Sequence, residues 1–186
     1  MTTKHAVKNL ARRVYARNGG ANVLVNCAVV FPQEDRNVKA STVSIDVIRQ
    51  ELEVNTLGSV NMTQAVLPAM QEANYGRIVQ MFGSWGSYKR ALEEVGAKGG
   101  AGYGMSKAAE LYYLASLAGE LKRTHNGVLI NALDPGKVKT NMNPGGDRLP
   151  EEVAAKVVAL ATLPIGSSTS GMVFRGETAV PFDSYL

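Results

Sequence analysis

The chain has 186 residues, of which 45% are hydrophobic and 19% charged, and its net charge is +4. This length fits one domain over residues 1–186, and the scattered basic residues lack the clustering that nucleic-acid binding requires. There is no run of roughly 18 apolar residues for a membrane span and no apolar signal-peptide core, so we expect a cytoplasmic protein without nucleic-acid or membrane partners.

Single residues of metal-binding or redox type are few. Cys27 is the one cysteine, which excludes an intrachain disulfide, and its apolar neighbours predict a small buried hydrophobic residue. His5 and His125 lie far apart without further ligands at suitable spacing. We therefore expect no metal site.

The first half of the chain alternates between helical and strand patterns. Apolar positions at helical spacing predict a helix over 4–17, which ends at the glycines that follow. The short apolar run 22–28 predicts a strand buried on both faces. After a polar loop, 43–71 has the pattern of a long helix weakened by Gly58, and the next strand is predicted over 77–82.

The second half continues the alternation. Residues 83–101 and 137–149 are rich in glycine and polar residues and are predicted to be long loops. Between and after them we predict further helices and strands, namely a helix over 102–122, a strand over 127–133, a helix from Pro150 to about Leu163, a strand over 171–176 and an irregular tail.

This order of elements indicates the α/β class. Strands that alternate with helices form a parallel sheet with helices on both faces, a three-layer α/β/α arrangement. Ligands of such sheets bind beyond the carboxyl ends of the strands. The loops that follow Ala28, Phe82 and Leu133 are therefore the expected site.

Tyr103 and Lys107 are the strongest candidates for chemistry. They are four residues apart at the start of a helix, which places them on one face. A tyrosine hydroxyl ordinarily titrates near 10, and an adjacent ammonium lowers its pKa. Such a tyrosine can exchange a proton with a carbonyl or alcohol oxygen at neutral pH. The spacing alone is weak, because solvated helix faces produce it by chance.

Five further blocks surround this pair in a recognisable order. Together with the pair they resemble the short-chain dehydrogenase/reductase family over nearly the whole chain. The six blocks are Asn22 to Ala28, Val54-Asn55-Thr-Leu-Gly58, Thr63 to Met70, Gly76-Arg-Ile-Val, Tyr103 to Lys107 with Ala108 and Ala109, and Asn131 to Thr140 with its Pro-Gly-x-Val-x-Thr pattern.

The resemblance implies a partial Rossmann-like, doubly wound sheet and a set of site residues. Tyr103 would be the general acid–base, and Lys107 would lower its pKa and hold the nicotinamide ribose. Asn55 would anchor a proton-relay water, although a helix kink or cap is the alternative role for it. Residues implied to line the cofactor are Asn26 and Ala28 on the adenosine side and Pro135, Gly136, Val138 and Thr140 at the nicotinamide and diphosphate.

The resemblance also implies partners. The cofactor would be NAD or NADP, with NADP slightly favoured, and the substrate would be a small carbonyl compound or alcohol. Members of this family commonly dimerise or form tetramers through the helices that correspond to 43–71 and 102–122. We therefore expect a homodimer or homotetramer through those helices.

One departure from the family concerns the catalytic serine. Without a gap after Gly76, the serine position falls on Gly83, and Ser84 follows one residue later. That hydroxyl normally bonds the substrate oxygen as charge develops, which a glycine cannot do. A one-residue shift would let Ser84 serve instead.

A second departure concerns the diphosphate. The TGxxxGxG turn, which holds the diphosphate at a helix N-terminus, is absent from the sequence. By the resemblance, the chain matches the C-terminal two-thirds of the family fold and lacks its first three strands. The strand at 22–28 would then become an exposed apolar edge, which invites pairing with a partner.

Three functions remain open at this point. The first is an NAD(P)-dependent oxidoreductase that reduces a carbonyl or oxidises an alcohol. The second is an inactive, truncated relative that acts through helix-mediated dimerisation. The third is a lyase or isomerase that uses the Tyr103 and Lys107 pair without hydride transfer.

Overall fold

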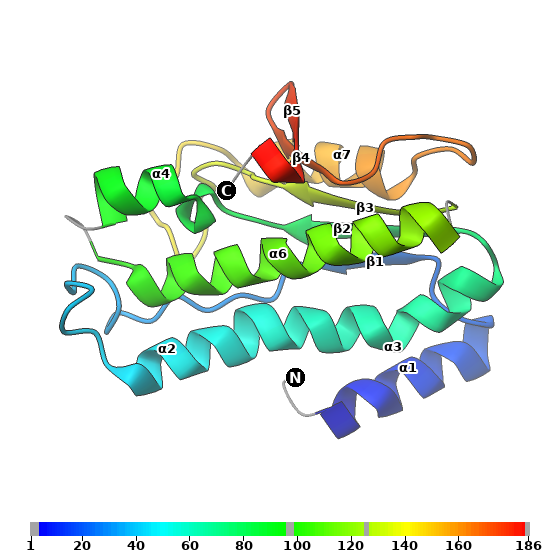
Figure 1. Ribbon diagram of the computed structural model, residues 1–186, viewed down its shortest axis with the longest axis horizontal. Coiled ribbons are helices and arrows are strands. Elements are labelled where there is room, and N and C mark those ends of the chain that lie inside the picture. The colour runs from blue at the N-terminus through cyan, green and yellow to red at the C-terminus, as the bar shows by residue number, and fades with distance from the viewer. Residues whose placement is uncertain (1–3, 96–98, 125–126, 185–186) are drawn as a thin grey trace.

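Four parallel strands and one antiparallel strand form the sheet of the computed structural model, which describes residues 4–95, 99–124 and 127–184 (Figure 1). The spatial order follows the chain order, and only the last pair is antiparallel. The strands are β1 (Val23–Asn26), β2 (Gly76–Met81), β3 (Val128–Leu133), β4 (Met172–Arg175) and β5 (Thr178–Pro181).

The helices lie on the two faces of this sheet, as the alternating pattern predicts. On one face are α2 (Ile45–Glu51), the π-helical segment η1 (Leu52–Leu57), α3 (Gly58–Glu72) and α6 (Ala101–Thr124), with α1 (Lys4–Asn18) packed outside α3 (Figure 1). On the other face is α7 (Pro150–Ala161). The α/β/α class and the parallel sheet are confirmed.

Two apolar clusters hold the layers together. The larger joins α3 and α6 to the sheet and includes Met70, Leu114 and Ile130. The smaller joins α7 to the opposite face through Leu160 and Val79. Because both faces of β2 and β3 are covered, β3 is fully buried and β2 is buried up to Met81 at its carboxyl end.

The prediction for β1 is wrong in one respect. Its side chains alternate between buried and exposed, and Val23 and Val25 are 42% and 36% exposed. β1 is the end strand of the sheet, so within the described residues it pairs only with β2, and its outward-facing side chains are left partly uncovered. Cys27, which follows β1, is exposed rather than buried, because the chain leaves the sheet there.

The predicted loop over 83–101 and the predicted tail contain regular structure. Short helical turns follow β2, namely η2 (Ser84–Gly86), α4 (Tyr88–Arg90) and η3 (Ala91–Val95). The tail forms β5, joined to β4 by a two-residue turn at Gly176 and Glu177, and Gly176 adopts a positive φ of 56° there. Both features are short, so the periodicity of the sequence is a poor guide to them.

The predicted helix over 43–71 is interrupted rather than continuous. Its middle turn, η1, is π-helical, a rare form that is frequent at functional sites. Asn55 lies in this turn, and its amide accepts from the Val30 amide group at 2.8 Å and donates to the Val30 carbonyl at 3.0 Å. The interruption therefore ties the helix to the chain that leaves β1.

Candidate active site

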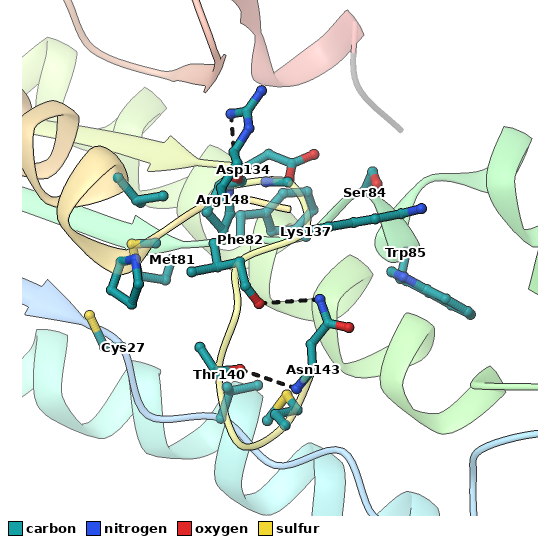
Figure 2. Close-up of a pocket in the computed structure, with 18 of the residues that line it drawn as sticks. Cys27, Met81, Phe82, Ser84, Trp85, Asp134, Lys137, Thr140, Asn143 and Arg148 are labelled. Atoms are coloured by element: carbon teal, nitrogen blue, oxygen red, sulfur yellow. Dashed lines mark hydrogen bonds between the residues drawn. The ribbon is translucent and has the colours of Figure 1, made fainter. Parts of the chain in front are cut away.

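A cavity of about 950 Å³ opens at the carboxyl ends of the parallel strands (Figure 2). Its walls come from the ends of β1, β2 and β3, the first turn of α6, the loop that follows β3 and one side of α7. Predicted site residues that line it are Ser84, Tyr103, Lys107, Pro135, Gly136, Val138 and Thr140. The three strand ends that the sequence pattern singles out therefore meet at one cavity.

Tyr103 lies in the first turn of α6, in an aromatic cluster. Its ring stacks on Phe31 with a centroid distance of 4.6 Å and meets Trp85 edge-on at 6.5 Å. Its backbone amide donates to the Asp35 carboxylate at 2.9 Å, so Asp35 holds the start of the helix. The tyrosine ring is thereby fixed between two loops that come from different strands.

Lys107 lies one turn further along α6 and is almost fully buried. Its ammonium donates to the Met81 carbonyl at 3.1 Å and to the Glu110 carboxylate at 2.9 Å. These contacts use two of its three protons, so one proton remains for a ligand in the cavity. The sequence prediction did not include Glu110.

The expected lowering of the Tyr103 pKa is not what the structure shows. The pKa of Tyr103 is raised, first by burial and then by the negative charges of Glu110, Asp134 and Glu51. Arg36 acts in the opposite direction but does not offset them. The sequence alone predicted that the Lys107 charge acts on the tyrosine. In the structure this charge is paired with the Glu110 carboxylate, which neutralises it.

Position 83 faces the Tyr103 hydroxyl. A Cβ atom built on Gly83 would lie 3.6 Å from the Tyr103 hydroxyl oxygen, and the φ of −151° at Gly83 is open to any residue. Ser84 also lines the cavity, but its hydroxyl accepts a hydrogen bond from Arg90. A catalytic role for Ser84 stays a prediction, and the geometry favours position 83 for such a hydroxyl.

The three remaining predicted residues do not line the cavity. Asn26 is buried and donates to Ser59 and Thr63 on α3, so its side chain joins the sheet to a helix. Ala28 is exposed beyond the end of β1. Asn55 acts at a helix irregularity, in line with the alternative reading of its role, and also donates to Ser106 at 2.9 Å.

The loop after β3 forms another wall of the cavity. Asp134 accepts from the Gly136 amide at 3.0 Å, and the positive φ of 73° at Gly136 turns the chain. Figure 2 shows Thr140 bonded to Asn143 within this loop. The predicted nicotinamide segment is therefore an ordered wall of the cavity.

The cavity residues that the sequence prediction missed include four around Tyr103. Phe31 and Trp85 form the aromatic cluster around Tyr103, and guanidinium groups lie over both rings, Arg36 over Phe31 at 4.5 Å and Arg90 over Trp85 at 5.1 Å. Arg36 also donates to the Met142 carbonyl at 2.9 Å, so it joins two loops across the cavity. Their one sequence signal was their position in loops that follow strands.

The structure identifies no metal site in the part of the chain it describes. No group of three or more His, Cys, Asp or Glu side chains gathers among these residues. His125 and the side chain of His5 lie outside them. Within the same residues, no helix has the length and apolar character to cross a bilayer.

Comparison with known families decides the classification. The sequence model of the short chain dehydrogenase family matches residues 1–148. This chain belongs to the short chain dehydrogenase family. The suspected family is thus confirmed, and the cavity lies where this family's parallel sheet opens.

Curated relatives are longer than this chain. The 3-oxoacyl-[acyl-carrier-protein] reductase FabG of Thermotoga maritima is 29% identical over 89% of the chain and 60% of its own length. Oxidoreductase UcpA of Salmonella typhimurium is 31% identical over 74% of the chain and 48% of its own length. The chain therefore spans about half of the relatives that it matches.

Solved structures support the same family fold. The serine dehydrogenase of Escherichia coli is 25% identical, with a TM-score of 0.73 over 96% of this chain and 72% of that one. The structure of gox2181 is 27% identical, with a TM-score of 0.73 over 86% of this chain and 65% of that one.

Proposed function

We propose that the chain carries the catalytic half of an NAD(P)-dependent oxidoreductase that reduces carbonyl compounds or oxidises alcohols. One observation carries the proposal: Tyr103 and Lys107 line the same cavity as the segment from Pro135 to Thr140, at the carboxyl ends of the strands. Family membership supports it, because the FabG and UcpA relatives are a reductase and an oxidoreductase.

Tyr103 would perform the proton transfer. In reduction its hydroxyl donates a proton to the carbonyl oxygen, and in oxidation its phenolate accepts the alcohol proton. Phe31 and Trp85 pack against the ring and fix its orientation. Lys107 would hold a ligand hydroxyl through its remaining proton. A bound nicotinamide supplies or accepts the hydride.

The residues present fit the nicotinamide half of the cofactor. An ammonium at Lys107, a hydroxyl at Thr140 and guanidinium groups at Arg148 and Arg175 line the cavity, a donor set that suits ribose and phosphate oxygens. A solved Escherichia coli relative was complexed with NADPH, and NADP is the slightly favoured form here. The diphosphate turn TGxxxGxG is absent from the sequence.

The test combines cofactor binding with hydride transfer. We expect calorimetric titration with NADPH and NADH to show binding, and a panel of carbonyl substrates to show NADPH consumption that Tyr103→Phe lowers by about 10²-fold or more. The variant keeps the ring that stacks on Phe31, so a fall in rate reports the hydroxyl alone. Equal rates in both proteins would refute the role of Tyr103.

A second candidate function is favoured by particular residues. Gly83 lacks the hydroxyl, and Leu57, Met105 and Tyr112 expose large apolar side chains on the helices of one face. A non-catalytic chain that forms a homodimer or homotetramer through 43–71 and 102–122 would combine these features. A folded protein that self-associates but binds neither cofactor would support this alternative.

A further inference from the structure

The ion pair between Lys107 and Glu110 is the least expected feature of the site. The two charged groups are 2.9 Å apart, and their side chains are only 2% and 1% exposed. Burying two charges is costly unless they are well paired, and removing one partner leaves the other uncompensated. The pair is therefore a built part of the site rather than a surface contact.

Glu110 lies on the same face of α6 as the proposed catalytic residues. It is three residues after Lys107, and Lys107 is four after Tyr103, so the three side chains follow one stripe of the helix. The second contact of the ammonium, to the Met81 carbonyl at the end of β2, fixes its position below the cavity. Glu110 and Met81 together determine where the Lys107 charge lies.

The surroundings of Glu110 act on its charge in opposite directions. The pKa of Glu110 is raised, because burial outweighs the lowering by the adjoining Lys107 ammonium and Ser59 hydroxyl. Ser59 comes from α3, where it also accepts from Asn26 and donates to Gln80. One carboxylate oxygen of Glu110 has no hydrogen-bond partner among the described residues, so its charge is only partly satisfied.

Glu110 is also the charge that acts most strongly on Tyr103. After burial itself, its carboxylate is the largest cause of the raised pKa of Tyr103, ahead of Asp134 beyond β3 and Glu51 on α2. Arg36, from the loop after β1, opposes all three. The Lys107 ammonium and the Glu110 carboxylate thus form a pair with no net charge.

We propose that Glu110 is a positioning residue that holds the Lys107 ammonium at the cavity as one half of a buried ion pair. The inference deepens the proposed oxidoreductase function, on which it rests. In this arrangement the tyrosine is kept as a proton donor, which suits carbonyl reduction. Alcohol oxidation needs the phenolate and is favoured only at alkaline pH.

The test removes the charge of Glu110 and keeps its shape. In Glu110→Gln the Lys107 charge is no longer cancelled, so we expect the ionisation of Tyr103 to move down by about one pH unit or more. Ultraviolet absorption of the phenolate, taken as the difference from the matched Tyr103→Phe protein, measures this without any turnover. The pH profile of alcohol oxidation is expected to shift in the same direction.

Two controls separate charge from structure. Glu110→Asp keeps the charge and is expected to leave the Tyr103 ionisation near that of the wild type, also if Glu110→Gln fails to fold. Glu120→Gln changes an exposed carboxylate on the same helix and is expected to leave the Tyr103 ionisation unchanged.

Particular results would overturn the inference. The first is a Tyr103 ionisation in folded Glu110→Gln that equals that of the wild type, or that is seen in neither protein up to alkaline unfolding. The second is a downward shift in Glu110→Asp as large as the shift expected for Glu110→Gln. Because the absorption readout needs no cofactor, absence of hydride transfer would count against the proposed function alone.

Discussion

At the scale of single residues, the site combines the proposed general acid, Tyr103, with a glycine at position 83. Gly83 lies opposite the Tyr103 hydroxyl, where the family carries a serine. Its extended backbone places no steric demand for glycine. Gly83 therefore differs from the family only in the missing hydroxyl, since its backbone could carry a serine.

Gly83→Ser should raise activity. A serine there would place a donor beside the developing charge on the substrate oxygen, and removal of one such donor from an enzyme costs about 10²- to 10³-fold. We expect kcat for carbonyl reduction to rise by about tenfold or more, measured as NADPH consumption. Gly83→Ala is the matched control and should give no gain, whereas equal rates for the two variants would refute the geometric argument.

Glu51 should make the stability of the fold depend on pH. Its carboxyl is fully buried against Asp35 and Gly102 at the start of α6, and its pKa is raised from 4.5 to about 8, first by burial and then by Asp35. A raised acid pKa means that the folded state holds the proton. The stabilisation is therefore complete below pH 4.5 and is lost as pH rises through about 8.

Glu51→Gln should remove this dependence. Between those two values the wild type should lose up to about 1.4 kcal/mol of unfolding free energy per pH unit from this group, and the neutral amide should not. Urea unfolding at pH 5 and pH 8.5 measures the difference. Glu53→Gln, on the exposed side of the same helical region, is the control, and parallel slopes for wild type and Glu51→Gln would contradict the prediction.

At the scale of elements, the π-helical turn η1 decides how the site is assembled. It places Asn55 against the backbone of Val30 and against Ser106 on α6, so one side chain joins three segments. Ordinary helical periodicity could not have revealed the extra residue in this turn.

Asn55→Ala should destabilise the fold. The substitution leaves the amide and carbonyl of Val30 without their partner in a partly buried site, which costs about 2–3 kcal/mol. Chemical denaturation measures this loss. Gln64→Ala, at an exposed position of the following helix α3, gives the comparison, and an equal cost for the two variants would argue against a special role for Asn55.

At the scale of the whole molecule, large apolar side chains are exposed at the end strand of the sheet and on the helices of one face. β1 ends the sheet with partly exposed valines, and α3 and α6 lie side by side on one face (Figure 1). Met105 and Tyr112, seven residues apart on α6, expose large side chains on that face. These features suit assembly through helices.

Tyr112→Glu should weaken self-association. A buried carboxylate at a helix interface costs far more than a buried ring, whereas at 70% exposure in the single chain the substitution leaves the fold intact. Sedimentation velocity should show a shift toward monomer. Tyr88→Glu, at a tyrosine of similar exposure on α4, is the control, and an unchanged sedimentation pattern in Tyr112→Glu would exclude this interface.

The sequence by itself determined the family, the α/β order and the shared helix face of Tyr103 and Lys107, because periodicity and motif spacing are local properties. Tertiary structure decided what those residues meet. The Lys107–Glu110 pair is buried, and burial raises the pKa of Tyr103. Contacts between loops place Phe31 against the Tyr103 ring and Gly83 near the Tyr103 hydroxyl. The loop contacts join residues far apart in the chain, and burial depends on the whole fold, so no local pattern records either of them.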